Sequence, residues 1–391
     1  MKALRIYAGP KALQHLREQG LRPQDVHTIP AAAGGPKGLI LGPLDRFLFG
    51  EWLPQSRQTV HLVGASIGAW RMASACLQGS VAAFERLEHD YIHQHYEPAP
   101  GAKRPTPQHV SERFSQTLQD FYGGRVDELL AHPRYRLHIV TSRGRHLLAR
   151  EHRAATPLGY LAAFLSNAMH RKAMGAWLER VVFSSPDPAQ PMGTCAVLPF
   201  GTHDFRTRQV LLTQANFMPA LQASCSIPFV LQAVQHIPGA PPGAYWDGGI
   251  TDYHLHLQYR QLLDAIENGA ESALPVGASA QKGVQSAGLV LYPHFQPQVV
   301  PGWLDKSLKW RHKATSALDS VVLLAPDPDW VRSLPHGKLP DRQDFMHYGS
   351  DTAARVQAWQ AATAASRQLA DEFGEWLLRP DGVVLRPLWV R

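Results

Sequence analysis

The sequence predicts an α/β protein whose mainly parallel central sheet lies between two layers of helices, a three-layer α/β/α arrangement. Short apolar runs alternate with helical patterns along the first part of the chain, which is typical of parallel strands joined by crossover helices. The 391 residues are 45% hydrophobic, enough for a sizeable core. Only 18% are charged, which excludes a disordered, highly charged chain.

Residues 1–77 alternate between strand and helix patterns. The expected strands are apolar or β-branched runs, and the expected helices repeat apolar residues every three or four positions. In order, these elements are a strand at 3–8, a helix at 10–21, a strand at 26–29, a helix at 39–52, a strand at 59–63 and a helix at 67–77. Two of the strand-to-helix junctions are rich in glycine and other small residues.

The rest of the chain continues with the same kinds of pattern. Further strands are expected at 137–141, 181–183, 210–213, 289–292 and 321–325, and long helices at 161–178 and 351–377. Proline-rich stretches between them are too short to link independent domains. We therefore expect one domain spanning 1–391, with insertions near 95–135 and 255–315 that cover the functional site.

Cysteine content and the N-terminal residues bear on the compartment. Cys76, Cys195 and Cys225 are too few and too widely spaced for a disulfide framework or a zinc site, which fits a reducing environment. The N-terminus lacks the apolar segment of a signal peptide, and no run of about 18 apolar residues occurs. These observations predict a cytoplasmic protein without a transmembrane helix. Its net charge of +7 permits peripheral contact with an anionic membrane.

The strongest functional signal is a G-x-S-x-G sequence at residues 64–68, where an expected strand gives way to an expected helix. A sharp turn in that context strains its central residue and exposes the side chain. Tight packing of such a turn accounts for Gly64 and Gly68. Ser66 is therefore the candidate nucleophile, and the first N–H groups of the helix, beginning with Ile67, point at any oxyanion formed there. A glycine-rich turn with an incidental serine is the alternative.

A second glycine-rich junction follows the preceding strand. Consecutive β–α loops of a parallel sheet lie at the same edge, so this loop can face Ser66 and expose backbone N–H groups to an oxyanion. The residues expected to form this oxyanion hole are Gly34, Gly35, Lys37 and Gly38. The phosphate-loop pattern G-x-x-x-x-G-K-[ST] is not matched, and a simple turn before a helix is the remaining alternative.

The candidate partner of Ser66 is Asp247, which begins an Asp-Gly-Gly turn after a short aromatic run. Gly248 and Gly249 let the backbone bring the carboxylate close to another element. A carboxylate that is hydrogen-bonded to a serine hydroxyl can act as its general base. The stretch 223–229, which ends in Ile-Pro-Phe, has small residues suited to close packing near the site.

These four segments, in this order, resemble the patatin-like phospholipases, and they span residues 34–249. That family combines a glycine-rich oxyanion loop, G-x-S-x-G, an A-S-x-A-x-P-x-x-F stretch and D-G-G or D-G-A. The resemblance implies a patatin-like fold, a Ser66–Asp247 dyad without a catalytic histidine, and hydrolysis of lipid acyl esters without a metal or organic cofactor. A lipid or other acyl ester is thus the expected partner, and nucleic acid is not.

The sequence departs from the family pattern at two places. Ala33, Pro36 and Lys37 stand where the family has a further glycine and an arginine, and a proline contributes no N–H. In the third segment, Ser226 replaces the common alanine, and a phenylalanine follows the proline directly. These departures bear on the substrate range and on the identity of the oxyanion donors, and they leave the nucleophile and the acid in place.

Other mechanisms and functions remain open alternatives. His254 and His256 follow Asp247, so a Ser–Asp–His triad competes with the dyad, although the alternation at 253–257 predicts that both histidines lie on one face of a strand. A soluble carboxylesterase or thioesterase acting on small substrates competes with the lipid hydrolase. A catalytically silent lipid-binding protein of the same fold is the third possibility, and the oligomeric state is open.

Three further groups of residues have both a functional and a simpler interpretation. Histidines at an expected helix end would bind a metal or be solvated; they are His89, His93 and His95. Arginines around one strand would steer anionic ligands or form a solvated surface; they are Arg134, Arg136, Arg143, Arg145, Arg150 and Arg153. The basic, aromatic segment 303–313 would form an interfacial helix at a membrane or a helix that faces the core.

Overall fold

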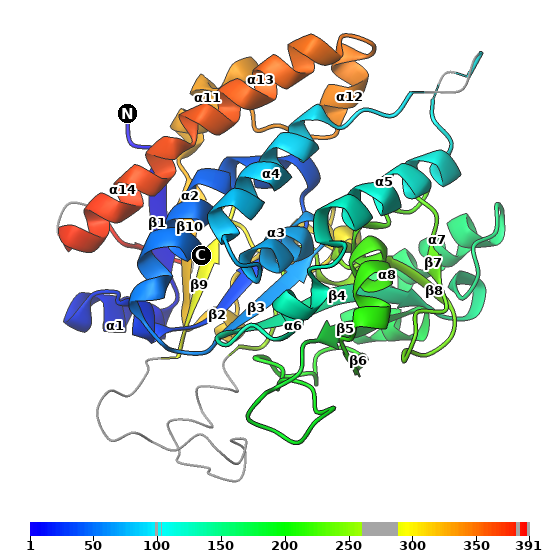
Figure 1. The fold of residues 1–391 in the computed structure, drawn as a ribbon, viewed down its shortest axis with the longest axis horizontal. Helices are drawn as coiled ribbons and strands as arrows, with labels where there is room; N and C mark the ends of the chain where they lie inside the picture. Colours follow the sequence, from blue (N-terminus) through cyan, green and yellow to red (C-terminus); the bar gives the residue numbers. More distant parts are fainter. Residues whose placement is uncertain (98–100, 103, 260–287, 381–383, 389–391) are drawn as a thin grey trace.

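The computed structural model describes residues 1–97, 101–102, 104–259, 288–380 and 384–388, and a single sheet runs through its centre (Figure 1). The strands are β1 (Leu4–Ala8), β2 (Val26–Ala31), β3 (Val60–Ala65), β4 (Tyr135–Gly144), β5 (Leu178–Ser184), β6 (Thr207–Leu211), β7 (Val234–Gln235), β8 (Ala244–Asp247), β9 (Leu289–Pro293), β10 (Val321–Pro326) and β11 (Arg386–Pro387). Their order is β11-β1-β10-β9-β2-β3-β4-β5-β6, with β8 paired to β4 and β7 to β8.

The middle of this sheet is parallel. β10, β9, β2, β3 and β4 form consecutive parallel pairs, whereas β1 pairs with β10, and β4 with β5 and β8, in the antiparallel sense. The predicted α/β class with a mainly parallel sheet is therefore confirmed. The short antiparallel strand β8 was not predicted, and it carries one of the site residues.

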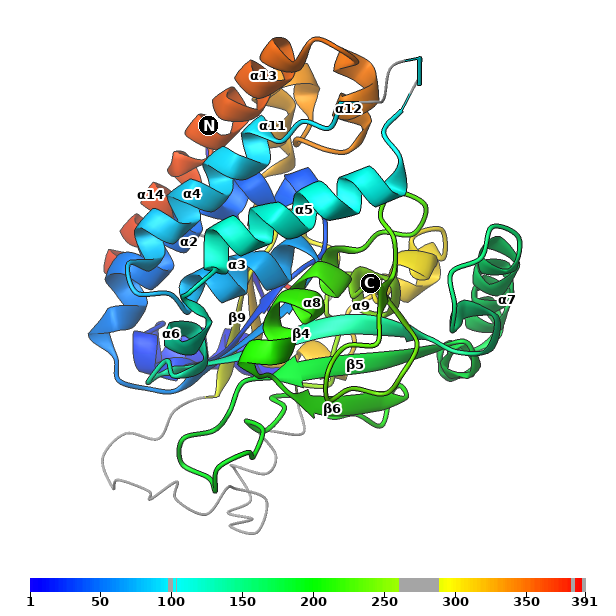
Figure 2. The same ribbon diagram turned by 45° about the vertical axis from the view of Figure 1, so that its right-hand side comes forward.

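Helices flank the sheet, an arrangement consistent with three layers. They are α1 (Pro10–Gln19), α2 (Gly42–Phe47), α3 (Ile67–Ala75), α4 (Ser80–His93), α5 (Pro107–Tyr122), α6 (Val126–Leu130), α7 (Ala155–Met169), α8 (Gln214–Cys225), α9 (Gly249–Asp252), α11 (Pro328–Ser333), α12 (Gln343–Tyr348), α13 (Thr352–Ala365) and α14 (Arg367–Leu378). α3 packs on β2, β3 and β4, and α2, α4 and α5 lie on the same side of the sheet in both views (Figure 1, Figure 2).

α3 sits in the core between the sheet and the outer helices. Every one of its residues is buried, as expected for a helix that is apolar on nearly all sides. Trp70 makes edge contacts with two phenylalanine rings of α5. The helix's charged residue, Arg71, makes two hydrogen bonds of 2.6 and 2.7 Å to the buried carboxylate of Asp45 in α2. This pairing fixes α3, which follows Ser66, against the helix that follows the glycine-rich loop.

Strand register brings the predicted site residues to one edge of the sheet. β2 and β3 are parallel neighbours, so the loops that follow them lie together. Ala65, the last residue of β3, is opposite Val140 of β4. β5 pairs along the other edge of β4, so β8 continues along the same edge as β3, with Asp247 opposite the next residue, Thr141. Ser66 and Asp247 therefore meet where β3 ends and β8 begins along that edge.

The predicted helix at 161–178 is wrong at both ends. α7 begins earlier and ends at Met169, a 3₁₀ segment covers Arg171–Ala176, and Leu178 begins β5. Periodicity alone cannot divide a continuous apolar region between a buried helix and a buried strand. The strand expected at 181–183 lies within β5, but all residues of β5 are buried, so no alternation of apolar and polar residues marks where the strand begins.

Other predicted boundaries also shifted. The strand expected at 210–213 ends at Leu211, because Thr213 caps α8 together with Asn216. The helix expected at 351–377 is divided at Ser366 into α13 and α14. The helix expected at 39–52 is α2 preceded by a 3₁₀ segment and followed by a π-helical turn.

Two predicted elements downstream of Asp247 are wrong. The strand expected at 253–257 is an irregular turn after α9, in which Leu255 has φ 47°. The basic segment 303–313 forms two separate 3₁₀ turns, η8 (Trp303–Asp305) and η9 (Lys309–Arg311), so it is neither of the continuous helices expected. Its lysines are therefore presented from a bent chain and not from one helical face.

The two predicted insertions have different outcomes. The region 95–135 contains α5 and α6. Residues 260–287 of the second insertion lie outside the described part of the chain. Among the helices that the structure describes, none combines the length and the apolar character needed to cross a bilayer.

Candidate active site

Ser66 lies at the turn where β3 ends and α3 begins. Its backbone has φ 56° and ψ −129°, a conformation that is strained for a non-glycine residue and typical of a nucleophile at such a turn. Close approach explains both flanking glycines. A Cβ on Gly64 would lie 2.4 Å from the Cα of Ala69, and a Cβ on Gly68 would lie 1.9 Å from the carbonyl oxygen of Ala31.

Asp247 ends β8 and faces Ser66. The Ser66 hydroxyl donates a hydrogen bond of 2.7 Å to Oδ2 of Asp247, and the N–H of Gly249 donates one of 2.7 Å to Oδ1. Both side chains are buried, with 4% of Ser66 and 6% of Asp247 exposed. A Cβ on Gly248 would lie 2.1 Å from the carbonyl oxygen of Val140, so the turn's approach to β4 requires glycine. The structure brings together the two residues that the sequence singled out.

The carboxyl group of Asp247 is surrounded by neutral donors at short range. Burial raises its pKa above the ordinary value for aspartate, and Arg342, the Ser66 hydroxyl, the Gly249 N–H and Lys306 limit that rise. Within the described residues, no cation lies within ion-pair distance of this carboxylate. A carboxylate kept basic in this way is suited to accept the proton of a serine hydroxyl.

Ser224, at the end of α8, supports the strained turn. Its hydroxyl accepts a hydrogen bond of 3.0 Å from the N–H of Ser66 and donates one of 2.7 Å to a carbonyl group of β4. Its own carbonyl accepts from the N–H of Gly248 at 3.1 Å, and the carbonyl of Ser226 accepts from the N–H of Asp247 at 2.8 Å. The sequence predicted only close packing for this stretch. These hydrogen bonds connect both halves of the candidate dyad to one helix end.

The glycine-rich loop after β2 divides between two cavities. Gly35, with φ 57°, and Ile67 line the cavity that contains the serine hydroxyl, whereas Gly34 and Lys37 line the other. The N–H groups of Gly35 and Ile67 donate to no acceptor in the described part of the chain. A Cβ on Gly38 would lie 3.3 Å from the side chain of Ile67. Of the expected oxyanion donors, Gly35 and Ile67 are thus the best placed.

The larger cavity has a volume of about 900 Å³ and contains Ser66 in its lining. Its walls are mainly apolar and come from α3, α4, α5 and α12, through Trp70, Tyr91, Phe114 and Phe345. Apolar residues also form its exposed rim: Phe229, Val230 and Met346 are 58%, 48% and 69% exposed. An elongated apolar group can therefore reach the serine hydroxyl from the surface.

The smaller cavity, of about 210 Å³, lies on the Asp247 side of the site. Three cationic side chains line it, Lys37, Lys306 and Arg342. Arg342 also lines the larger cavity, so the two spaces adjoin at the dyad. Arg342 was not singled out from the sequence, and Lys306 was noted only within a basic segment, because no local pattern connects either residue to Ser66.

No protein-family model matches this sequence, and no curated protein matches it either. The chemistry of the site is therefore inferred from its own residues and their contacts.

The two histidines downstream of Asp247 take part in other contacts. Nδ1 of His254 lies 3.0 Å from both a carbonyl oxygen and a backbone nitrogen of the loop 298–300. Nε2 of His256 lies 2.9 Å from the Thr315 hydroxyl. Burial lowers the pKa of His254 well below its ordinary value and that of His256 to about 4. In the part of the chain that the structure describes, neither imidazole hydrogen-bonds to the dyad, which favours the dyad over a triad.

The other histidines singled out from the sequence lie along and after α4. His89 and His93 are neighbours with ring centroids 4.2 Å apart, and His93 bonds to the carbonyl of His89. His95 lies 3.3 Å from the Thr352 hydroxyl. Across the residues that the structure describes, no three histidine, cysteine or acidic side chains come together as a metal site.

Four of the six arginines singled out around β4 have partners within the protein. Arg134 and Arg136 donate to backbone carbonyls near the start of the strand. At its other end, Arg143 pairs with Glu179 at 2.8 Å, and Arg145 donates to the carbonyl of the 3₁₀ segment before β5. These four side chains therefore stabilise the ends of β4, and their contacts account for their positions.

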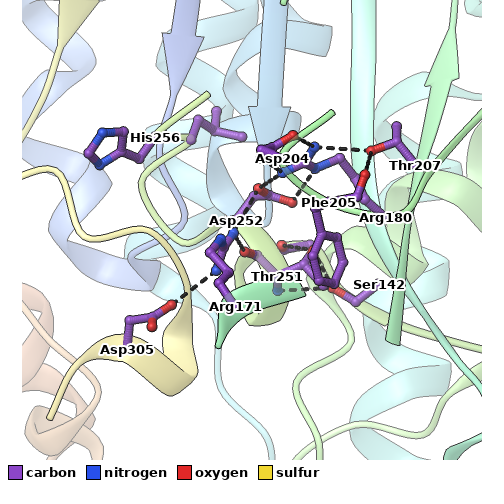
Figure 3. A network of polar contacts seen from close by, with 12 residues as sticks. Ser142, Arg171, Arg180, Asp204, Phe205, Thr207, Thr251, Asp252, His256 and Asp305 are labelled. Atoms are coloured by element: carbon purple, nitrogen blue, oxygen red, sulfur yellow. Dashed lines mark hydrogen bonds and ion pairs between the residues drawn. The ribbon is translucent and has the colours of Figure 1, made fainter. Parts of the chain in front are cut away.

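A buried polar network secures the segment that follows Asp247 (Figure 3). The side chain of Arg180, on β5, is completely buried and donates hydrogen bonds of 2.7 and 2.6 Å to the two carboxylate oxygens of Asp252 in α9. Its other side donates to Asp204 at 3.1 and 2.9 Å. Burial raises the pKa of Asp204, but the charge and the hydrogen bonds of Arg180 lower it more. The pKa of Asp204 is therefore below its ordinary value.

The same network extends from α9 to η8 (Figure 3). Arg171 donates to the carbonyl of Thr251 at 2.5 Å and to Asp305 at 3.0 Å. The hydroxyls of Thr251 and of Ser142 on β4 lie 3.0 Å apart. These bonds connect the segment that follows Asp247 to Asp305, which directly precedes Lys306. They therefore hold Lys306 in a fixed position relative to Asp247.

Proposed function

We propose that the protein is a serine acyl hydrolase that cleaves carboxylic esters of lipids, in the manner of the patatin-like phospholipases. The observation that carries this proposal is the 2.7 Å hydrogen bond from strained Ser66 to buried Asp247, next to an apolar cavity of about 900 Å³. The order of the four motifs along the chain supports the same family, with a phospholipase A type of reaction and a patatin-like version of the α/β fold. Peripheral contact with membranes belongs to this proposal.

The acylation step follows from the geometry of the dyad. Ser66 Oγ attacks the carbonyl carbon of the ester while its proton passes to Oδ2 of Asp247, which already accepts the hydroxyl hydrogen bond. The tetrahedral oxyanion then accepts hydrogen bonds from the N–H groups of Gly35 and Ile67. Removing one such donor typically lowers kcat about 10²–10³-fold. When the intermediate collapses, the C–O bond to the alcohol breaks and Asp247 returns the proton to the leaving oxygen.

Deacylation repeats the same steps with water. Asp247 accepts a proton from a water molecule, whose oxygen attacks the acyl carbon bound to Ser66. The bond to Oγ breaks, the serine oxygen takes the proton back from the carboxyl group, and the fatty acid leaves. Each step uses only the dyad and backbone N–H groups.

The larger cavity is suited to the acyl chain. Its apolar walls reach from the serine hydroxyl to a rim that includes exposed Phe229 and Met346. Burying a methylene group contributes roughly 0.8 kcal/mol, so longer chains gain binding free energy along these walls. This expectation separates a lipid hydrolase from an esterase for small substrates.

The test is hydrolysis of p-nitrophenyl acetate, octanoate and laurate by the full chain. We expect kcat/KM to rise with chain length, and Ser66→Ala to lower kcat by at least about 10⁴-fold. Ser74→Ala is the matched control, because Ser74 is a buried serine on the same helix that bonds to the carbonyl of Trp70. A fluorophosphonate should label wild-type protein and Ser74→Ala, but not Ser66→Ala.

Each alternative predicts a different result. A preference for acetate would replace the lipid hydrolase by a small-substrate esterase or thioesterase. Unchanged turnover in Ser66→Ala would exclude this serine as the nucleophile. Absence of both turnover and labelling would favour a silent lipid-binding protein.

A further inference from the structure

Three cations converge on the smaller cavity from separate parts of the chain. Lys37 comes from the loop after β2, Lys306 follows η8, and Arg342 precedes α12. Among the described residues, no carboxylate lies within ion-pair distance of any of the three. Asp341 also lines the cavity, but it is paired with Lys338 at 3.0 Å. The cavity therefore has an excess of positive charge that the neighbouring acids do not neutralise at contact distance.

The two lysines lie against aromatic rings. Nζ of Lys306 is 3.9 Å from the ring centroid of Tyr253 and 5.9 Å from that of Trp303. Nζ of Lys37 is 5.6 Å from the centroid of Phe295. Burial, followed by the repulsion of nearby cations, lowers the pKa of Lys306 to about 8, and burial lowers that of Lys37 as well. Their positions are thus unfavourable for isolated ammonium groups, which is typical of a site that binds an anion.

The two cavities would hold different parts of an ester substrate. An ester with its carbonyl oxygen at the Gly35 and Ile67 N–H groups would place its acyl chain in the larger cavity, which contains both of these residues. The alcohol side then lies toward the cavity of Asp247 and the cations. Arg342 lines both cavities and thus marks the boundary between the two parts.

We propose that the smaller cavity binds a compact oxyanion, a phosphate or a carboxylate, carried on the alcohol side of the substrate ester, through Lys37, Lys306 and Arg342. This inference rests on the proposed acyl hydrolase function and names its substrate class. The substrate is an amphiphile with one long acyl chain and a small anionic alcohol. Guanidinium and ammonium groups donate charge-assisted hydrogen bonds to such an anion, and a cationic space of about 210 Å³ does not suit a second long chain.

The proposed anion and the three cations keep their charges through the reaction, although Asp247, which takes up the proton, lines the same cavity. The attraction between the anion and the cations is therefore similar in the bound substrate and in the transition state, and such uniform binding lowers KM without raising kcat. A cation acting on the chemical step itself would instead change kcat. This difference separates a binding subsite from an electrostatic effect on Asp247.

The first experiment compares three esters with the same acyl chain below their micelle concentrations: decanoyl glycerol phosphate, decanoyl glyceric acid and neutral monodecanoylglycerol. We expect kcat/KM at least about tenfold higher for an anionic ester than for the neutral one, mainly through KM. Comparing the two anionic esters distinguishes phosphate from carboxylate. Lys306→Gln and Arg342→Gln should each reduce the preference about tenfold, as expected for loss of a charge-assisted contact.

Matched controls remove surface cations that lie outside the cavity. Lys309→Gln lies on the same chain segment as Lys306, and Arg332→Gln lies on the exposed side of α11. Both should keep the full anion preference. Neither Lys306 nor Arg342 forms an ion pair with another described residue, so their variants are expected to fold, and urea unfolding of each variant verifies this.

The second experiment measures binding without turnover. Calorimetry of the full chain carrying Ser66→Ala would be performed with glycerol phosphate and with inorganic phosphate. We expect both to bind, glycerol phosphate more tightly, and binding to weaken at least about tenfold when Lys306→Gln is added. Phosphate binding that persists in the absence of any esterase activity would overturn the proposed function and leave the anion site standing. Dyad-dependent hydrolysis with no anion preference and no phosphate binding would overturn the anion site alone.

Discussion

Asp247 and Asp252 are buried carboxylates on one short segment, but their surroundings differ. Asp247 accepts hydrogen bonds from neutral groups, the Ser66 hydroxyl and the Gly249 N–H. Asp252 accepts two from the guanidinium of Arg180. A carboxylate that faces a fixed cation is held in place by charge-assisted hydrogen bonds, whereas one that is bonded to neutral donors can take up a proton during a reaction. The comparison separates a reactive group from the support that positions it.

The largest effect is expected when the reactive carboxylate is neutralised. In Asp247→Asn, the amide oxygen can still accept from the Gly249 N–H, and the amide can donate to the Ser66 hydroxyl. The base is lost while the packing is kept, so we expect kcat to fall about 10²–10⁴-fold. The free energy of unfolding should hardly change. Ester turnover and urea unfolding measure the two effects.

Histidine variants provide the control for this result. His254→Gln and His256→Gln should retain far more activity than Asp247→Asn, because their imidazoles contact the loop 298–300 and Thr315. A triad would require one of these variants to lose activity as severely as the aspartate variant. That result would also mean that Asp247 supports a histidine base and is not the base itself.

The second largest effect is expected for the supporting carboxylate. Asp252→Asn leaves the completely buried Arg180 with only Asp204 as an acidic partner. Breaking a buried ion pair typically lowers the free energy of unfolding by about 3–5 kcal/mol. Urea unfolding should therefore show a large loss of stability, while kcat per folded molecule falls much less than in Asp247→Asn.

An exposed ion pair serves as the matched control. Asp329 pairs with Arg332 on α11, and both side chains are more than half exposed. Exposed pairs contribute little to stability, so Asp329→Asn should unfold almost as wild type does. Equal losses in the two asparagine variants would show that the network in Figure 3 is not a special support of the site.

The pH dependence of turnover tests whether Asp247 is the base. Burial raises the pKa of Asp247 above its ordinary value, and only the ionised carboxylate can act as the base. For a neutral ester, kcat/KM should fall tenfold per pH unit below this pKa and level off above it. Because Arg342 and Lys306 hold the pKa down, Arg342→Gln and Lys306→Gln should each move this acid limb to higher pH. A limb that disappears in His256→Gln would identify a histidine base instead.

The reactive turn could be predicted because its requirements appear as a short pattern in the sequence. Gly64 is required by a contact with α3 and Gly68 by a contact with the neighbouring strand β2, and the strand–turn–helix pattern is visible within a few residues. Asp247 was found through the glycines that follow it, one of which passes too close to β4 for a side chain. Such requirements leave a trace in the sequence at the position itself.

The supporting network and the cationic cavity depend on distant segments, and the sequence has no pattern for them. Arg180 lies in a region where the predicted helix at 161–178 had obscured the start of β5. Lys306 was assigned to a continuous helix that is in fact two short turns. Arg342 stands in a loop before a short helix, with nothing nearby to relate it to Ser66. These positions follow from sheet order and loop packing, which are properties of the whole fold.

The smallest effect is expected at the junction between the reactive residue and its support. The Ser224 hydroxyl accepts a hydrogen bond from the N–H of strained Ser66 and donates one to a carbonyl group of β4. Ser224→Ala leaves that buried N–H without its acceptor, which should cost about 1–2 kcal/mol in the free energy of unfolding and lower kcat about tenfold as the turn loosens. Ser226→Ala is the matched control, because its hydroxyl donates to the carbonyl of Gln222 in its own helix. If both variants behave alike, Ser224 only fills space; if Ser224→Ala alone loses turnover, the helix end positions the nucleophile and the support extends beyond the ion pairs.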